Sequence, residues 1–169
     1  MRTRSVLTSL AVVSGALFAP GIGVLTTAGA AHAVTKISHA TATSMFSASG
    51  ITWSSSGNCW DRNNPTCTSF DQLNLATAQG AQTLRSASGC ALNITGGTEV
   101  GHASGTYSHW NGYKLDFGKA KCLATYIQNN FTYIGVRGDG APQWQSASGN
   151  VYADEGNHWD VTYYNCGGC

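Results

Sequence analysis

The sequence predicts a small single α+β domain in which a mainly antiparallel sheet carries flanking helices. Segments with helical and strand-like patterns alternate along the chain, and the strand-like segments alternate apolar with polar residues. All six cysteines lie beyond residue 33, in a stretch long enough for one core but small enough to gain from covalent bridges. Helices mixed with antiparallel strands in a chain of this length indicate one layered, disulfide-stabilised domain.

The first 33 residues have the pattern of an export signal. Arg2 and Arg4 precede the apolar stretch VLTSLAVVSGALFAPGIGVL, and AHA at residues 31–33 is a small-x-small cleavage signature. Serine, glycine and proline interrupt the apolar stretch and no second long one follows, so we expect no integral membrane association. We therefore expect residues 1–33 to be a secretion signal peptide of bacterial type, and residues 34–169 to be a secreted, extracellular domain.

The cysteine count predicts three disulfides, because an even number in a small exported domain is typical of a disulfide framework. Six cysteines allow fifteen pairings, and sequence alone does not choose among them. We expect bridges between Cys59 and Cys67, Cys90 and Cys122, and Cys166 and Cys169. A cysteine-bound metal is the alternative, but CGGC is a single close pair without a second pair to complete four ligands.

Charge is sparse and nearly balanced, with 10% charged residues and a formal net charge of +1. No basic run could neutralise a phosphate backbone, so the sequence gives no support to nucleic-acid binding. Ser, Thr, Asn and Gly dominate the polar residues, as in many proteins that work outside the cell. We expect a monomer with a polar, nearly neutral surface.

Two features dominate the first half of the domain. Residues 50–70, GITWSSSGNCWDRNNPTCTSF, are rich in Gly, Asn, Ser and Pro, which predicts an irregular loop tied by Cys59 and Cys67. Ser69 with Gln72 three residues on matches a capping box and predicts a helix that ends near residues 86–89. The apolar residues expected on one face of that helix are Phe70, Leu73, Ala81 and Leu84.

The second half predicts strands with one helix between them. Expected strands are CALNITGG at 90–97, GYKLDF at 112–117, FTYIGV at 131–136, NVYADEG at 150–156 and HWDVTYY at 158–164, with a helix at 118–130 and a Gly-rich turn at 137–142. In the second of these strands Leu115 and Phe117 point one way and Asp116 the other. If the apolar pair fills the core, Asp116 faces the opposite surface or a cleft.

The candidate chemistry lies where histidines meet carboxylates. His158 and Asp160 share one face of the last strand, so pairing of that strand with the strand of Asp116 would let His109, Asp116 and His158 converge. Two imidazoles and one carboxylate leave a tetrahedral zinc ion one open position, which is typical of a catalytic site, where zinc lowers the pKa of bound water to about 7. Glu155, three residues before His158, could then act as the general base.

Other interpretations of these residues stay open. Histidine and aspartate in a Ser/Gly-rich loop also form turns and surface hydrogen bonds. His102 is a rival ligand, because it too precedes the aspartate strand and lies between two glycines, whereas His39 has no carboxylate nearby in the sequence. The tryptophans could be core residues or a sugar-stacking platform; those considered are Trp110, Trp144 and Trp159.

The motif HWNGYKLDF from His109, followed by EGNHW from Glu155, resembles the paired signatures of the zinc D-alanyl-D-alanine carboxypeptidase and dipeptidase family. That family shares its fold with the Hedgehog signalling domain, and the resemblance covers roughly residues 70–164. It implies a Hedgehog/DD-peptidase-like fold and one bound zinc ion. His109 and Asp116 of H-x-x-G-x-x-x-D, together with His158 of E-x-x-H, would be the ligands, and Glu155 the base.

The chain departs from the family pattern at two places. Family members usually carry a serine two residues before the first histidine, whereas this chain has Tyr107 there and Ser108 next to the histidine. They also carry an arginine after the first core strand, and the corresponding TGGTEVGH has none, although Arg62 or Arg137 could approach from another loop. The residue that stabilises an oxyanion, and the choice between carboxypeptidase and endopeptidase, are therefore open.

The resemblance implies a secreted zinc metallopeptidase, a hydrolase that cleaves amide bonds in peptidoglycan stem peptides of the cell wall or in related D-amino-acid peptides. The alternative is a non-catalytic cell-wall or protein-binding module on the same fold. Asp160 has three possible roles, as a fourth ligand, as a carboxylate that orients a ligand imidazole, or as a solvent-facing strand residue. We favour the second role, because such carboxylates commonly support metal-binding histidines, and we expect Ser108 to be a supporting residue as well.

Overall fold

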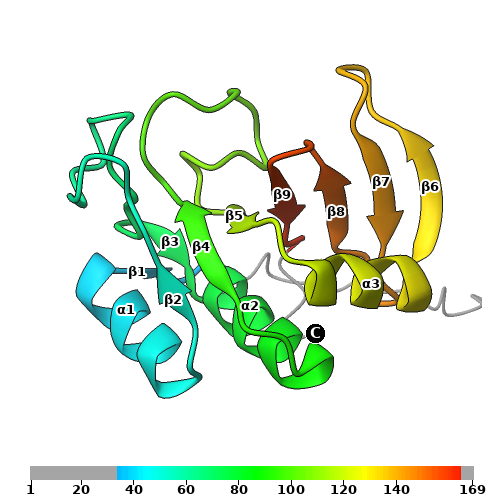
Figure 1. Cartoon of the computed structure of the whole chain (residues 1–169). Coiled ribbons are helices and arrows are strands. Elements are labelled where there is room, and N and C mark those ends of the chain that lie inside the picture. Colours follow the sequence, from blue (N-terminus) through cyan, green and yellow to red (C-terminus); the bar gives the residue numbers. More distant parts are fainter. Residues whose placement is uncertain (1–33, 165–169) are drawn as a thin grey trace, which may run out of the picture. The chain divides into compact units, whose positions relative to one another are not determined.

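The computed structural model describes residues 34–164, which form a small α+β domain with three helices, a seven-stranded sheet, a two-stranded sheet and two disulfides (Figure 1). The expected signal peptide at 1–33 and the expected Cys166–Cys169 bridge lie outside these residues. No helix in the range 34–164 is long and apolar enough to cross a membrane. The predicted α+β class with a mainly antiparallel sheet is confirmed.

The larger sheet has the strand order β2-β4-β5-β9-β8-β7-β6, and its neighbours are antiparallel except for the parallel pair β2 and β4. Its strands are β2 (Thr52–Trp53), β4 (Asn93–Gly96), β5 (Lys114–Gly118), β6 (Thr132–Val136), β7 (Pro142–Gln145), β8 (Val151–Asp154) and β9 (His158–Thr162). The smaller sheet pairs β1 (Lys36–Ile37) with β3 (Leu73–Asn74). The central pair β5 and β9 joins two segments that are far apart in the sequence.

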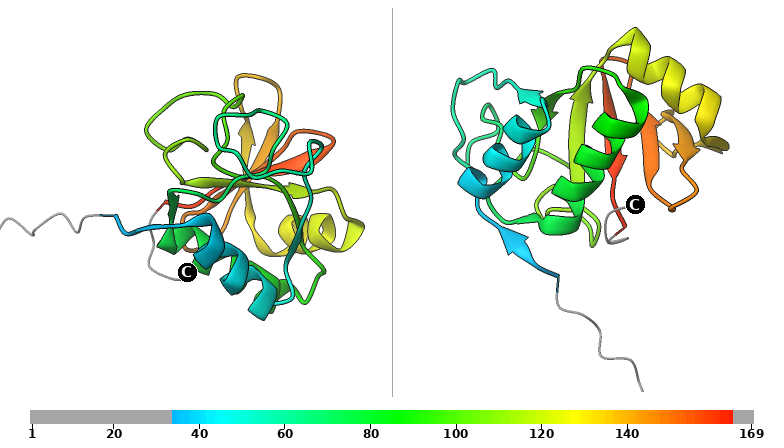
Figure 2. Two further views of the ribbon diagram at one scale, coloured as in Figure 1. Left: turned by 90° about the vertical axis from the view of Figure 1, so that its left-hand side faces the viewer. Right: turned by 90° about the horizontal axis from the view of Figure 1, so that it is seen from below.

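Three helices bury the apolar face of the larger sheet. They are α1 (His39–Ala48), α2 (Leu75–Ser88) and α3 (Lys121–Asn130), with α1 and α2 lying side by side (Figure 2). Leu115 and Phe117 of β5 and Val161 of β9 are fully buried in one cluster with residues of all three helices. Because side chains alternate along a strand, Asp116 and Asp160 project from the opposite face. The period-two interpretation of these strands is confirmed.

The predicted capping box is wrong. Helix α2 begins at Leu75 with Asn74 at its N-cap, and Gln72 has a φ of 62°, outside helical geometry. Leu73 and Asn74 pair with β1 instead, and this tertiary pairing overrides the local capping signal. The predicted end of the helix is confirmed, because Gly89 follows Ser88 with a φ of 66° as a left-handed cap.

Helix α1 lies in a segment expected to be either helical or flexible, and strand β7 was not predicted. Helix α1 is capped by Ser38, whose hydroxyl accepts a hydrogen bond from the amide of Thr41 at 3.2 Å. Its sequence, HATATSMFSA, is rich in small and β-branched residues, and only Ala42 and Phe46 are buried, so its apolar period is weak. Strand β7 contains Pro142 and two glutamines and shows little alternation.

Two of the expected disulfides are confirmed. Cys59 and Cys67 close the irregular loop after β2, with their Cα atoms 4.7 Å apart. Cys90 and Cys122 join the segment before β4 to the first turn of α3, with their Cα atoms 5.8 Å apart. The second bridge therefore ties the segment that leads into β4 to a covering helix.

We predict that the two bridges stabilise the domain unequally. The Cys90–Cys122 bridge spans 32 residues and the Cys59–Cys67 bridge spans 8. Loop-closure entropy then gives about 3.7 kcal/mol for the longer loop and about 2.5 kcal/mol for the shorter one. Urea unfolding of Cys90→Ala/Cys122→Ala and of Cys59→Ala/Cys67→Ala should rank them in that order. A larger loss from the shorter bridge would contradict the prediction.

Candidate metal centre

Two acidic side chains lie directly opposite each other in the middle of the larger sheet. The antiparallel register of β5 and β9 pairs Asp116 with Asp160, and each residue is only 5% exposed. Oδ1 of both carboxylates is buried and forms no hydrogen bond, and its partners are ion-pair contacts with histidine Nε2 atoms at 3.2–3.6 Å. Adjacent buried carboxylates are costly unless cations or ligands compensate them. The pairing of β5 and β9 therefore creates a strongly negative site that cations or ligands must compensate.

His109 approaches this point on the loop between β4 and β5. The loop turns back at Gly112, which has a φ of 75° and where a Cβ atom would lie 2.5 Å from the carbonyl oxygen of Gln72. Nδ1 of His109 donates a hydrogen bond to the carbonyl of Gly97 at 2.7 Å. This leaves Nε2 at 3.2 Å from Oδ1 of Asp116 and 3.6 Å from Oδ1 of Asp160.

His158, the first residue of β9, lies close to the same carboxylate. Its Nδ1 donates to the side-chain oxygen of Asn157 at 2.7 Å, and its Nε2 lies 3.6 Å from Oδ1 of Asp116. Oε2 of Glu155 lies 3.2 Å from the same Nε2. The structure therefore brings His109, Asp116, His158 and Glu155 together, as the strand-pairing hypothesis expects.

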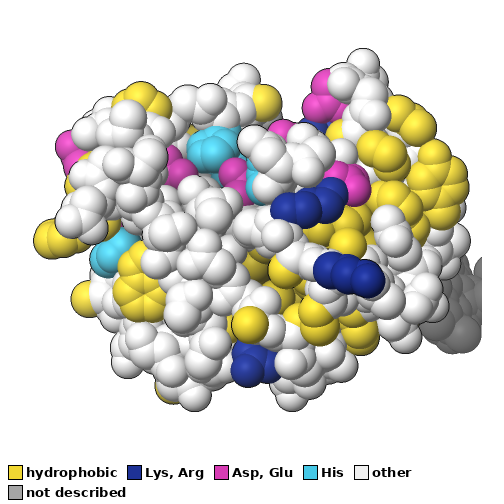
Figure 3. Space-filling view, viewed as in Figure 1, with side chains coloured by type: hydrophobic (Ala, Val, Ile, Leu, Met, Phe, Trp, Pro, Cys, Tyr) yellow, Lys and Arg dark blue, Asp and Glu magenta, His cyan; other side chains and the backbone are white. Residues whose placement is uncertain are grey.

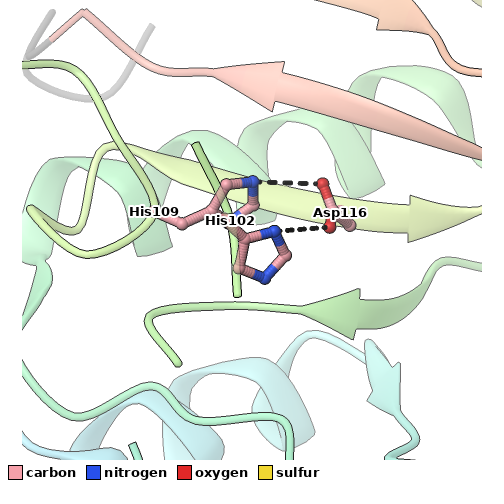
Figure 4. Close-up of side chains that lie close together, drawn as sticks. All are labelled: His102, His109 and Asp116. Atoms are coloured by element: carbon pink, nitrogen blue, oxygen red, sulfur yellow. Dashed lines mark ion pairs between the residues drawn. The ribbon is translucent and has the colours of Figure 1, made fainter. Parts of the chain in front are cut away.

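The rival ligand His102 is also at the centre. Its ring stacks on that of His109 with centroids 3.8 Å apart, and its Nδ1 lies 3.7 Å from Oδ2 of Asp116 (Figure 4). Ligand atoms of His102, His109 and Asp116 all lie within 4.8 Å of one another, so these three residues could hold a metal ion. Among the described residues this is the one group of three that meets this spacing, and it contains the rival ligand His102 together with His109 but not His158.

Glu99 holds His102 in place, and sequence reasoning missed this residue. Its carboxylate accepts Nε2–H of His102 at 3.1 Å and the backbone amides of Ser69 and Gly97 at 2.7 and 3.0 Å. Burial would raise the pKa of Glu99, but these hydrogen bonds lower it below its ordinary value. The spacing of Glu99 and His102 in TEVGH is a sequence signal that could have identified this pair. The resemblance to the family directed attention instead to the arginine that this segment lacks.

The three imidazoles share one hydrogen-bonding pattern. One ring nitrogen of each histidine donates a hydrogen bond: His109 to Gly97, His158 to Asn157 and His102 to Glu99. The other ring nitrogen of each lies near the carboxylate of Asp116. Metal-binding histidines are commonly held in this way, since the outer hydrogen bond selects the tautomer that leaves a free lone pair at the metal. Together with the unpaired Oδ1 of Asp116, this donor set suits a borderline divalent ion.

Two cationic side chains hold the second carboxylate oxygen of Asp160, Oδ2. Oδ2 accepts hydrogen bonds from Nζ of Lys114 at 2.6 Å and Nη1 of Arg137 at 2.7 Å. Burial would raise the pKa of Asp160, but His109 and Lys114 hold it well below its ordinary value. The burial excludes the solvent-facing role. Oδ1 of Asp160 lies 3.6 Å from Nε2 of His109, the nitrogen that would face a metal ion, whereas the outer nitrogen Nδ1 is bonded to Gly97. Of the two remaining roles, this position favours a fourth ligand over a carboxylate that orients the imidazole.

Two further residues support the centre. Arg137, in the turn between β6 and β7, donates to Oε1 of Glu155 as well as to Asp139 and Asp160, and these carboxylates raise its pKa. Glu155 is thereby held with its second oxygen toward His158. The hydroxyl of Ser108 accepts from the amide of Asn111 at 3.2 Å, so it supports the loop that carries His109.

His109 is cationic in the metal-free protein. Burial would lower its pKa, but the carboxylates of Asp116 and Asp160 outweigh burial and raise the pKa of His109 to about 10. A proton on Nε2 then compensates the two opposed carboxylates. A metal ion that binds Nε2 must displace this proton.

The centre is accessible from outside. Figure 3 shows histidine and acidic side chains gathered in a hollow above the middle of the larger sheet. A Cβ atom at Gly96 would lie 2.4 Å from Oδ2 of Asp116, so only glycine fits beside this carboxylate on β4.

Comparisons with protein-family models, with curated proteins and with solved structures gave no match. The chemistry of the centre is therefore argued from its own geometry.

We predict that metal binding at neutral pH releases about one proton, because the pKa of His109 is raised from 6.5 to about 10. Calorimetric titration with Zn²⁺ as the probe ion, in pH 7 buffers of different ionisation enthalpy, measures this number. The apparent affinity should rise with pH until about pH 10 and then level. Binding without proton release would mean that His109 is neutral or is not a ligand.

The raised pKa of His109 also predicts how the free energy of unfolding of the metal-free protein depends on pH. The pKa of His109 is 6.5 in the unfolded chain and about 10 in the folded protein, so protonation of His109 stabilises the fold. This stabilisation is complete below pH 6.5 and is lost as the pH rises toward about 10. Urea unfolding of the metal-free wild type should therefore show a free energy of unfolding that falls between pH 6 and pH 10. The fall should be smaller in His109→Gln, which cannot carry the proton, and an equal fall in both would contradict the assignment.

Proposed function

We propose that the protein is a secreted zinc metallopeptidase. The observation that supports this most directly is the buried Oδ1 of Asp116, which has no hydrogen bond and lies 3.2 Å from Nε2 of His109 and 3.6 Å from Nε2 of His158. His109, Asp116 and His158 would be the zinc ligands, and zinc, when bound, supplies a Lewis acid that lowers the pKa of water to about 7. The paired motifs around His109 and Glu155 agree with this assignment.

The role proposed for Glu155 is that of the general base. Its side chain is 31% exposed, so a water molecule can reach it, and its Oε2 lies beside His158 at 3.2 Å. A carboxylate in this place can take a proton from the attacking water and pass it to the leaving amine. Arg137 contributes by holding Oε1, which restricts the carboxylate to one orientation.

The cations near the centre favour an endopeptidase over a carboxypeptidase. Recognition of a free C-terminal carboxylate usually requires an unengaged arginine or lysine. Among the residues described, Arg137 is engaged by three carboxylates, Lys114 by Asp160, and Arg62 by the carbonyls of Thr98 and Trp110. We infer that the protein binds its substrate along the peptide chain rather than at a free C-terminal carboxylate. Stem peptides of peptidoglycan, or related D-amino-acid peptides, are the substrate class implied by the resemblance to the Hedgehog/DD-peptidase fold.

A non-catalytic wall-binding module is the second candidate. Trp60 and Trp110 are 67% and 43% exposed, which is unusual for tryptophan and favours a surface that binds a polymer. In this alternative the metal would be structural or absent, and Glu155 would be a partner of Arg137 only.

The ligand set is tested by comparing His158→Ala with His102→Ala. His158 faces the unpaired Oδ1 of Asp116 together with His109, whereas His102 faces Oδ2 and stacks parallel to His109. We therefore expect His158→Ala to lose stoichiometric zinc and His102→Ala to keep one equivalent with weaker affinity. Metal analysis after dialysis against buffered zinc measures both. The opposite result would make His102 the third ligand.

The proposed activity is tested with Glu155→Gln. This substitution should lower turnover at least about 100-fold, because it removes the base, while one equivalent of zinc stays bound. Asp139→Asn is the matched control, since Asp139 contacts the same guanidinium but is 54% exposed and lies outside the ligand group. The assay is the release of new amino termini from peptidoglycan, with and without a chelator.

The outcomes separate the candidates. An absence of metal-dependent release by the zinc-loaded wild type from several wall types would overturn the peptidase. Full activity in Glu155→Gln would remove this residue from the reaction. Tight wall binding without cleavage would favour the module.

A further inference from the structure

A second hollow lies between the loop that follows β2 and the start of α1. Its volume is about 1190 Å³, and its wall contains the rings of His39, Trp53 and Trp60. Hydroxyl, amide and carboxylate side chains surround these rings, among them Asn58, Asn63 and Asp71. The left side of Figure 3 shows a histidine surface next to hydrophobic side chains in this region. None of these residues belongs to the metal centre.

The rings form a platform that begins in the core. Phe70 is fully buried, His39 stacks on it with centroids 5.2 Å apart, and Trp60 stacks on the outer side of His39 at 5.9 Å. Trp60 is 67% exposed, so its burial does little for the fold. An indole that is inclined by 26° to the His39 ring and open to solvent offers a ready face for another ring.

The loop that carries Trp60 is braced from within. Besides the Cys59–Cys67 bridge, the amide of Gly57 donates to the carbonyl of Thr66 at 2.6 Å, and the amide of Thr68 donates to the carbonyl of Cys59 at 3.1 Å. A rigid loop loses little conformational entropy when a ligand binds. The platform is therefore formed before any ligand arrives.

Polar groups at the cavity complete the recognition set. Nδ1 of His39 accepts the amide N–H of Phe70 at 3.0 Å, and burial lowers the pKa of His39, so the neutral ring carries its proton on Nε2. Within residues 34–164, neither this Nε2 nor the carboxylate of Asp71 has a side-chain hydrogen bond. A donor and an acceptor are thus free beside the stacking surface.

We propose that this cavity binds a β-linked pyranose chain, with a sugar ring stacked on Trp60 and its hydroxyls bonded to His39 and Asp71. Pyranose rings combine an apolar C–H face with a rim of hydroxyl groups, which matches a tryptophan face surrounded by amides and carboxylates. A phosphorylated ligand would need an unengaged cation, and Arg62 is engaged by Thr98 and Trp110. The proposal does not depend on the peptidase activity.

Calorimetric titration of the full domain with chitotetraose and with cellotetraose tests the site. We expect saturable binding of at least one oligosaccharide, weakened about tenfold or more by Trp60→Ala and largely kept by Trp60→Phe. Tyr133→Ala is the matched control, because Tyr133 is a 55% exposed aromatic on β6, at the other edge of the sheet. Asp71→Asn should weaken binding without loss of the stack. Glu155→Gln should bind as wild type, which separates this site from the metal centre.

Each outcome bears on the proposal. Binding of chitotetraose alone would assign amino-sugar chains, and binding of cellotetraose would extend the site to plain glucose chains. No saturable binding of either at millimolar concentration, or equal binding by folded Trp60→Ala, would overturn the proposal. A stem tetrapeptide that binds with the same dependence on Trp60, where the oligosaccharides do not, would replace the sugar by a peptide.

Discussion

The opposition of Asp116 and Asp160 across β5 and β9 is the constraint on which the rest of the site depends. Side chains of directly opposed strand residues are about 5 Å apart, where two negative charges repel by about 3 kcal/mol at an effective dielectric constant of 20. Each residue is 5% exposed, so water relieves little of this repulsion. Lys114 and Arg137 neutralise one side of Asp160, and His109 lies between the two unpaired oxygens.

A metal ion that bound at this centre would compete with the proton on His109 for the same position. One imidazolium at His109 compensates only part of the two carboxylates, whereas a divalent cation compensates both and uses the imidazole as a ligand. The hydrogen bond from His109 to Gly97 is compatible with either state, because it occupies only Nδ1. The backbone around the centre can therefore stay unchanged when the ion replaces the proton.

The sequence predicts the strand faces well because they follow from a local rule. Alternation in GYKLDF and HWDVT places Asp116 and Asp160 opposite the core residues, and the structure agrees. Other features depend on contacts between distant segments. Glu99 is held by the amide of Ser69, thirty residues away, and α2 starts late because Asn74 pairs with β1. No local pattern contains such contacts, so the Ser69–Glu99 contact and the start of α2 were beyond sequence reasoning, whereas the Glu99–His102 pair, three residues apart, had a local signal.

The distribution of charge is an argument that the centre is functional rather than structural. The chain has only eight Asp and Glu residues, and four of them lie at the centre: Glu99, Asp116, Glu155 and Asp160. Buried charges are weak contributors to stability, and well-packed apolar residues in the same places are often as stable or more so. Trp159 and Val161 show that β9 packs apolar residues without strain on its other face. A chain with 10% charged residues that places half of its carboxylates at one site therefore carries an electrostatic cost that stability alone does not require, and a bound cation would remove this cost.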